Sequence, residues 1–112
     1  MTYHSLNTTF AALADPTRRA MLVRLMKGPA TVKDLARPFD MTLPTTLQHL
    51  KKLESSGLIR TEKQGRTRTC HAEPAALAPA QDWIAEQRAI WASRLDRLEA
   101  YLDTPDAAPR QD

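Results

Sequence analysis

The segment from residue 42 to residue 52 carries side chains that can form hydrogen bonds with base edges and phosphates. A step of ~100° per residue along a helix puts Leu43, Leu47 and Leu50 on one face. The opposite face then holds Thr45, Gln48 and Lys52, with Pro44, His49 and Lys51 beside them and Thr42 at the start. Glutamine can bridge an adenine, threonine can contact a thymine methyl, and lysine can reach guanine or phosphate. No acidic residue, which phosphate would repel, occurs between residues 43 and 53. This face is therefore a candidate DNA-binding surface, although an ordinary surface helix can also be polar on one side.

A second basic group follows around Gly65. Threonines on both sides of this glycine, and the Gly-centred turn itself, predict a hairpin with strands at residues 58–62 and 67–71 and a turn at residues 63–66. Its exposed side would carry Lys63, Arg66 and Arg68. We expect these basic side chains to hold DNA phosphate or to enter a minor groove.

Two short helices joined by a tight turn would position the first group. Thr31 is a good cap for a helix that Pro38 ends, and Thr42 is a good cap for a longer helix. Gly57 is the expected left-handed stop of that second helix. Residues 31–38 and 42–56 therefore predict a helix-turn-helix, whose second helix carries the polar face.

Further helices are expected before and after this unit. Apolar residues at helical spacing predict a helix over residues 6–14, and Asp15-Pro16 begins another that ends at Gly28. A long helix is predicted from about Pro79 to Tyr101. The fold class is thus mainly α with a small β-hairpin, a winged helix-turn-helix of order α-α-α-α-β-β-α. Residues 1–103 would form one DNA-binding and dimerisation domain, and residues 104–112 have the composition of a disordered tail.

The long helix carries an apolar seam that predicts a homodimer. Leu77, Ile84, Trp91 and Leu98 lie seven residues apart, as do Arg88, Leu95 and Leu102. The expected interface consists of Leu6, Phe10, Ile84, Trp91, Leu95, Leu98 and Leu102. A dimer would present two copies of the 42–56 helix about one DNA turn apart, ~34 Å, and would bind an inverted repeat.

Charge is distributed unevenly along the chain. Residues 1–72 carry twelve basic and five acidic side chains, a balance of +7, whereas residues 73–112 carry four basic and eight acidic ones, a balance of −4. A basic first part favours a polyanion partner such as double-stranded DNA. A solvated Lys/Arg surface would explain the same charge equally well.

Two runs of residues resemble the ArsR (arsenical-resistance repressor) family of bacterial transcription regulators. They are Phe10-Ala-Ala-Leu-Ala-Asp-Pro-Thr-Arg-Arg19 and Leu43-Pro-Thr-Thr-Leu-Gln-His-Leu-Lys-Lys-Leu-Glu-Ser-Ser-Gly-Leu-Ile59. The resemblance spans roughly residues 4–103, and residues 83–101 are similar to a branch that lacks the metal-binding motifs. It implies a dimeric winged helix that represses, and less often activates, nearby genes.

The family's usual metal ligands are missing from this chain. Metal-sensing members use paired cysteines in the helix before the turn, or Asp, His and Glu pairs on the last helix. Here residues 31–36 contain no thiol and the last helix contains no histidine. Cys70 and His71 are adjacent, so on a strand their side chains point to opposite faces and form a poor chelate. We expect no metal and no cofactor.

Cys70 and His49 each have two interpretations. Cys70 is the only cysteine, which excludes an intrachain disulfide and favours a reducing cytoplasm. It could act as a redox switch if Arg68 lowered its pKa, or it could be a small buried side chain in the hairpin. His49 could contact DNA, or it could form hydrogen bonds within the domain.

Other function classes find little support. The three glycines are far apart, so there is no Gly-rich phosphate loop, and no Ser–His–acid pattern suggests catalysis. No stretch approaches the ~20 apolar residues of a membrane span. We therefore predict a sequence-specific DNA-binding repressor and no enzyme. The alternatives are a winged-helix protein-interaction module without DNA and a regulator that responds to thiol oxidation. No inducer can be identified from the residues.

Overall fold

The computed structural model describes residues 2–103, with side chains from residue 6 onward. The predicted tail, residues 104–112, lies outside the described residues. Two compact units form, one ending at Ala80 and one beginning at Gln81, and each is described by itself.

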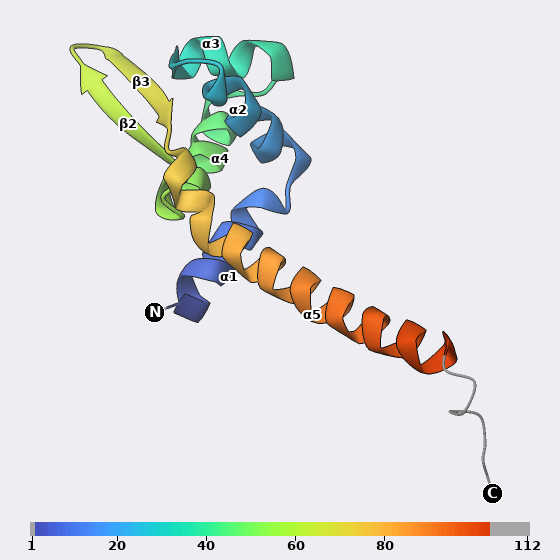
Figure 1. Cartoon of the computed structure of the whole chain (residues 1–112). Helices are drawn as coiled ribbons and strands as arrows, with labels where there is room; N and C mark the ends of the chain where they lie inside the picture. The colour runs from blue at the N-terminus through green and yellow to red at the C-terminus, as the bar shows by residue number, and fades with distance from the viewer. Residues whose placement is uncertain (1, 104–112) are drawn as a thin grey trace, which may run out of the picture. The chain divides into compact units, whose positions relative to one another are not determined.

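The first unit contains four α-helices and a small sheet (Figure 1). The helices are α1 (Thr2–Leu13), α2 (Pro16–Met26), α3 (Val32–Ala36) and α4 (Leu43–Ser55). The strands are β1 (Ala30–Thr31), β2 (Ile59–Gln64) and β3 (Thr67–Ala72), and α5 (Ala78–Asp103) begins at the end of this unit. The predicted order of helices and hairpin, a winged helix-turn-helix, is confirmed.

The starts of α2, α3 and α4 are fixed by the predicted caps. The carboxylate of Asp15 accepts a hydrogen bond from the Arg18 amide at 3.0 Å. The hydroxyl of Thr31 accepts one from the Asp34 amide at 3.1 Å, and that of Thr42 accepts one from Thr45 at 3.3 Å. Each bond provides an acceptor for a backbone amide of the first turn, which has no helix carbonyl to bond. The starts of these helices therefore follow from local chemistry.

The sheet differs from the prediction in two ways. A third strand, β1, pairs with β3 through Ala30 opposite Cys70, giving the antiparallel order β1-β3-β2. The hairpin turn is also shorter than predicted, because β2 continues through Gln64, which pairs with Thr67. Only two residues remain between the strands, and Gly65 has a φ of +63°, as tight hairpin turns require.

Two short 3₁₀ turns were also not predicted. One follows α3 at Arg37–Phe39, so the α-helix stops before Pro38 while the turn continues through it. The residue that follows this turn, Asp40, adopts a left-handed φ of +50°. The other turn, Pro74–Leu77, leads from β3 into α5. Contacts with the rest of the fold hold such short segments, so periodicity does not reveal them.

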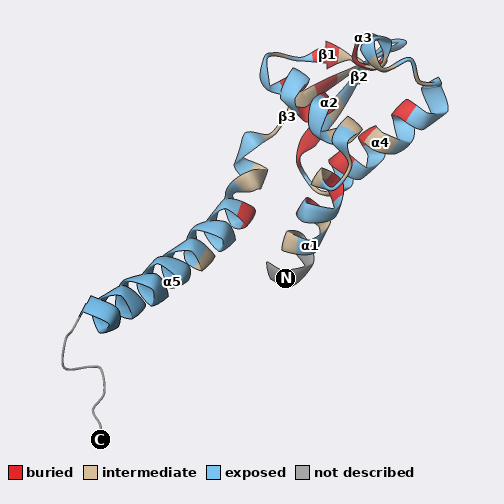
Figure 2. Cartoon of the chain, turned by 90° about the vertical axis from the view of Figure 1, so that its right-hand side faces the viewer, coloured by how far each residue is buried: buried red, intermediate tan, exposed pale blue. Residues whose placement is uncertain are grey.

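The core lies where α2, α3 and α4 meet the sheet (Figure 2). The largest fully buried side chains are Met21, Leu35, Thr46, Leu53, Leu58 and Cys70. Burying an aliphatic side chain of this size contributes about 1.5–3 kcal/mol. The helix-turn-helix and the hairpin therefore share one core.

The orientation of α4 corrects the predicted apolar face. Thr46 is fully buried, whereas Leu43 and Leu47 are 56% and 43% exposed. Thr46 can be buried because its hydroxyl donates to the Thr42 carbonyl at 3.0 Å, which satisfies the polar group. The buried face of α4 runs through Thr46, Leu50 and Leu53, so the helix is turned by roughly 60° from the predicted orientation.

In the second unit, α5 continues as a single helix to Asp103. From Gln81 to Asp103 nearly every residue is exposed (Figure 2). Its large apolar side chains include Ile84, Trp91, Leu95, Leu98 and Leu102, each between 44% and 71% exposed. Contiguous exposed apolar surface of this kind is typical of a contact with another protein surface.

Candidate nucleic-acid interface

Helix α4 presents the predicted polar side chains on its solvent side. Pro44, Thr45, Gln48, Lys51 and Lys52 are all exposed. The Thr42 hydroxyl, besides capping α4, donates to the Thr45 hydroxyl at 3.0 Å. This bond fixes the two threonines at the first turn of α4, the end at which the helix dipole attracts anions.

The exposed residues of α4 fall into two groups on different sides of the helix. Gln48, Lys51 and Lys52 line a groove of about 500 Å³ whose other wall is formed by Thr8 and Ala11 of α1. A second group, Leu43 and Leu47, faces the hairpin. The predicted face is therefore not one continuous row, since Gln48 and the lysines lie on the α1 side.

A second groove joins α3, α4 and the hairpin. It has a volume of about 710 Å³, and Leu43, Leu47, Lys33, Arg66 and Arg68 are among its lining residues. None of the described residues that line it is acidic. Three basic side chains thus surround the exposed leucines, a charge pattern that attracts a polyanion. Lys33 was missed by sequence reasoning, because it belongs to the first helix of the pair and only the fold brings it here.

The hairpin, called the wing from here on, carries basic side chains at different positions along its length. Lys63 and Arg66 are exposed near its tip. Arg68 donates through Nη1 to the Thr61 hydroxyl at 2.8 Å, and this hydroxyl donates to Glu54 Oε2 at 3.1 Å. One bond occupies only one of the five N–H donors of an arginine. The wing therefore presents basic side chains at its tip, while Arg68 also connects β3 to α4 through Thr61.

Arg60 lies on the wing but is occupied by carboxylates. Its guanidinium pairs with Glu62 and, at 2.6 Å, with Glu73. The hydrogen bond that Arg60 donates to the Glu62 carboxylate is the main reason why the pKa of Arg60 is raised above its ordinary value. Its charge is compensated locally, which distinguishes it from Lys63 and Arg66 nearer the tip.

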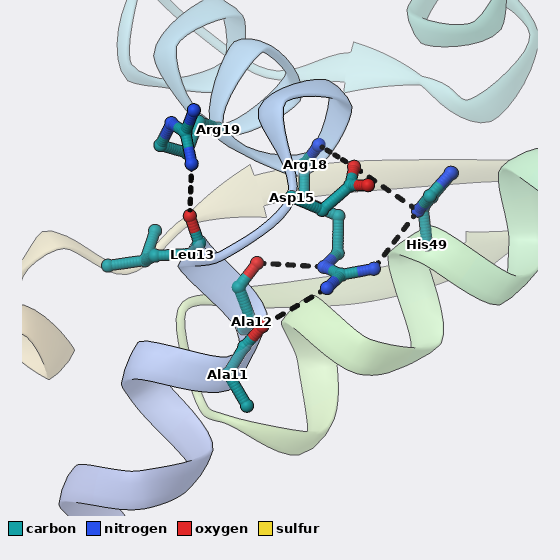
Figure 3. Close-up of polar contacts among 7 residues, drawn as sticks. All are labelled: Ala11, Ala12, Leu13, Asp15, Arg18, Arg19 and His49. Atoms are coloured by element: carbon teal, nitrogen blue, oxygen red, sulfur yellow. Dashed lines mark hydrogen bonds and ion pairs between the residues drawn. The ribbon is translucent and has the colours of Figure 1, made fainter.

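His49 points into the protein rather than away from it (Figure 3). Its side chain is 19% exposed, and Nδ1 lies 3.3 Å from Arg18 Nη1 and 3.9 Å from Asp15 Oδ2. Arg18 also donates to the carbonyls of Ala12 at 2.7 Å and Ala11 at 3.1 Å. The structure therefore favours the second interpretation of His49, a hydrogen bond within the domain.

Arg18 was not recognised as a site residue from the sequence. It connects the end of α1, the start of α2 and the middle of α4, and so holds α4 in place. The Arg18 amide, followed by the nearby charges of Arg18 and His49, holds the pKa of Asp15 below its ordinary value of 3.8 despite partial desolvation. The Asp-Pro-Thr-Arg spacing was the available signal, since it puts the arginine next to the cap.

Cys70 is fully buried in the core. Burial is the main reason why the pKa of its thiol is raised, and the charge of Glu54 adds to this while Arg68 acts in the opposite direction. A protonated, buried thiol is a poor nucleophile, so the environment favours a packing role. Within the described residues, no group of three or more His, Cys, Asp or Glu side chains could hold a metal ion.

The fold and this surface define a class of protein. A second helix with an exposed polar side, next to a basic wing, is the arrangement of a winged helix-turn-helix DNA-binding regulator. In the part of the chain that the structure describes, no helix is long and apolar enough to cross a membrane.

Comparison with known proteins identifies the family. A helix-turn-helix domain family (HTH_20) matches residues 13–62. The HTH-type transcriptional regulator Rv2034 of Mycobacterium tuberculosis is 40% identical over 77 residues, which cover 69% of this chain and 72% of that protein. The transcriptional repressor SdpR of Bacillus subtilis is 34% identical over 54% of this chain and 68% of its own length.

The solved structures agree with these relatives. The crystal structure of an ArsR family transcriptional regulator is 56% identical, with a TM-score of 0.77, over 80% of this chain and 93% of that one. The chain belongs to the ArsR family of transcriptional regulators, as the two sequence runs predicted. Both relatives are transcriptional regulators, the class of protein that the sequence predicted in place of an enzyme.

Proposed function

We propose that the protein is a repressor that acts as a homodimer on an inverted-repeat DNA operator in the cytoplasm. The observation that carries the proposal is the groove between α3, α4 and the wing, which is lined by Lys33, Arg66 and Arg68 and by no acidic residue among those described. Phosphate is the ligand that such a surface favours. The resemblance to the repressor SdpR supports repression as the outcome of binding.

In this proposal α4 enters the major groove with its first turns. Thr42, Pro44 and Thr45 approach the DNA first, and the helix dipole at this end of α4 favours a phosphate. Gln48 contacts a base edge, with adenine as the partner that its amide matches best. Lys51 and Lys52 reach phosphates beside the groove, while His49 positions α4 through Arg18.

The wing supplies contacts that do not depend on sequence. Lys63 and Arg66 are exposed near its tip, and Arg68 lines the groove beside α4. Such side chains can hold the backbone or enter a neighbouring minor groove. Their contribution should be strongly sensitive to salt, because each contact with a phosphate releases counterions.

The dimer is proposed from the exposed apolar seam of α5. Trp91 is 65% exposed, and Leu95, Leu98 and Leu102 are between 53% and 71% exposed. Pairing two copies along this seam, together with Leu6 and Phe10 of α1, would remove that surface from water. The two α4 helices would then read half-sites about one DNA turn apart.

Selection from a pool of random duplexes tests this proposal. The full-length protein should enrich two inverted half-sites whose centres lie about 10 base pairs apart. A single unpaired half-site would overturn the dimer, and no enrichment at all would favour a protein-interaction module. Repeating the selection with oxidised and reduced protein examines the redox alternative, which predicts that only one form enriches a site.

A further inference from the structure

Two leucines are exposed on α4 while a threonine between them in the sequence is buried. Leu43 is 56% and Leu47 is 43% exposed, whereas Thr46 is fully buried and donates its hydroxyl to the Thr42 carbonyl. This reverses the usual preference of leucine for the core. The core packs without these two side chains, so their exposure calls for another explanation.

The surroundings of the two leucines indicate what covers them. They are four residues apart and therefore lie on one side of α4, in the groove that Lys33, Arg66 and Arg68 also line. Three cations around an apolar strip match a partner that carries negative charge. A DNA duplex offers the complementary combination, with phosphates for the cations and an apolar group within the groove.

That apolar group is the C5 methyl of thymine, which projects into the major groove and is absent from the other three standard bases. We propose that Leu43 and Leu47 select thymine at the operator positions next to the wing by packing on its methyl group. This inference rests on the proposed DNA-binding function. It adds an apolar contact with the bases to the hydrogen bonds expected of Gln48, which lies on a different side of the same helix.

The test uses a duplex selected by the protein and a copy in which every thymine is replaced by deoxyuridine. This replacement removes the methyl groups and keeps the hydrogen-bonding edges. The wild type should bind the deoxyuridine copy more weakly, by about fourfold for each contacted methyl, as expected for one buried carbon. The double variant Leu43→Ala/Leu47→Ala should bind the two duplexes equally well.

A matched control is Val23→Ala, which truncates an exposed apolar side chain on α2. It should keep the wild-type preference for thymine. Thermal unfolding of all variants checks the fold, and exposed positions should show little change.

Two results would overturn the inference. One is equal binding of both duplexes by the wild type, and the other is an undiminished preference for thymine in the double variant. In either case selective binding of the chosen duplex would leave the proposed function standing. Failure of the wild type to bind any selected duplex would instead remove the proposed function and the inference with it.

Discussion

Thr46 and Leu47 show how a single hydroxyl can change the interpretation of a helix. Periodicity alone assigns leucines to the buried side, because it treats threonine as polar. In the structure the Thr46 hydroxyl donates a hydrogen bond to the Thr42 carbonyl and the side chain is buried, whereas Leu47 is exposed. The polar residues proposed to contact DNA remain exposed, but the buried face of α4 runs through Thr46 instead of Leu47.

Replacing Gln48 with alanine should reduce sequence preference. Its amide is proposed to bridge one adenine, so Gln48→Ala should cost about 1–3 kcal/mol at one base position and little elsewhere. Competition binding with every single base-pair change in the selected site measures this. Unchanged preference at every position would exclude Gln48 as a base-reading residue.

Replacing Arg66 should have a different effect. Arg66→Ala should weaken selected and unrelated duplexes alike and reduce the salt slope by about 2 for a dimer, one phosphate contact per subunit. Gln64→Ala, a neighbouring uncharged change on the wing, is the control and should keep the wild-type slope. A variant whose slope equals that of the wild type would show that Arg66 does not contact phosphate.

At the level of elements, the starts of α2, α3 and α4 could be predicted from local chemistry. The pairing of strands far apart in the sequence could not. Asp15, Thr31 and Thr42 were recognised as caps because the bond that each forms lies within its own turn. Strand β1 was missed because its two residues become a strand only by pairing with β3, about forty residues later. The groove lined by Lys33 was missed for the same reason, since three separate elements form it.

The Asp15 cap should make stability depend on pH in acid. The pKa of Asp15 is lowered in the folded state, so its ionised form stabilises the fold above the ordinary value of 3.8. That contribution is lost as the pH falls through the lower, folded-state pKa. Asn is also a good cap but does not titrate, so Asp15→Asn should lack this component.

Urea unfolding of both proteins over a series of acidic pH values measures the effect. The difference in unfolding free energy between wild type and Asp15→Asn should change steadily as the pH falls below about 3.8. A difference that stays constant over this range would show that the Asp15 carboxylate does not stabilise the start of α2.

For the whole molecule, the seam of α5 is the feature on which the proposed dimer depends. Trp91→Lys would place a charge within the seam and should convert the proposed dimer into a monomer at micromolar concentration. Ser93→Lys is the matched control, because residue 93 lies on the opposite side of α5. Sedimentation velocity distinguishes the two species. A monomeric wild type, or a dimeric Trp91→Lys variant, would contradict the proposed interface.

The basic groove beside α4 is proposed to bind a specific DNA sequence. The most direct test of this proposal is an anisotropy titration of the wild type with the selected duplex and with a scrambled duplex, from about 50 to about 200 mM salt. We expect the selected duplex to bind more tightly by a factor of about a thousand or more, and affinity to fall steeply as salt increases. Equal binding of the two duplexes, or binding that does not respond to salt, would contradict it.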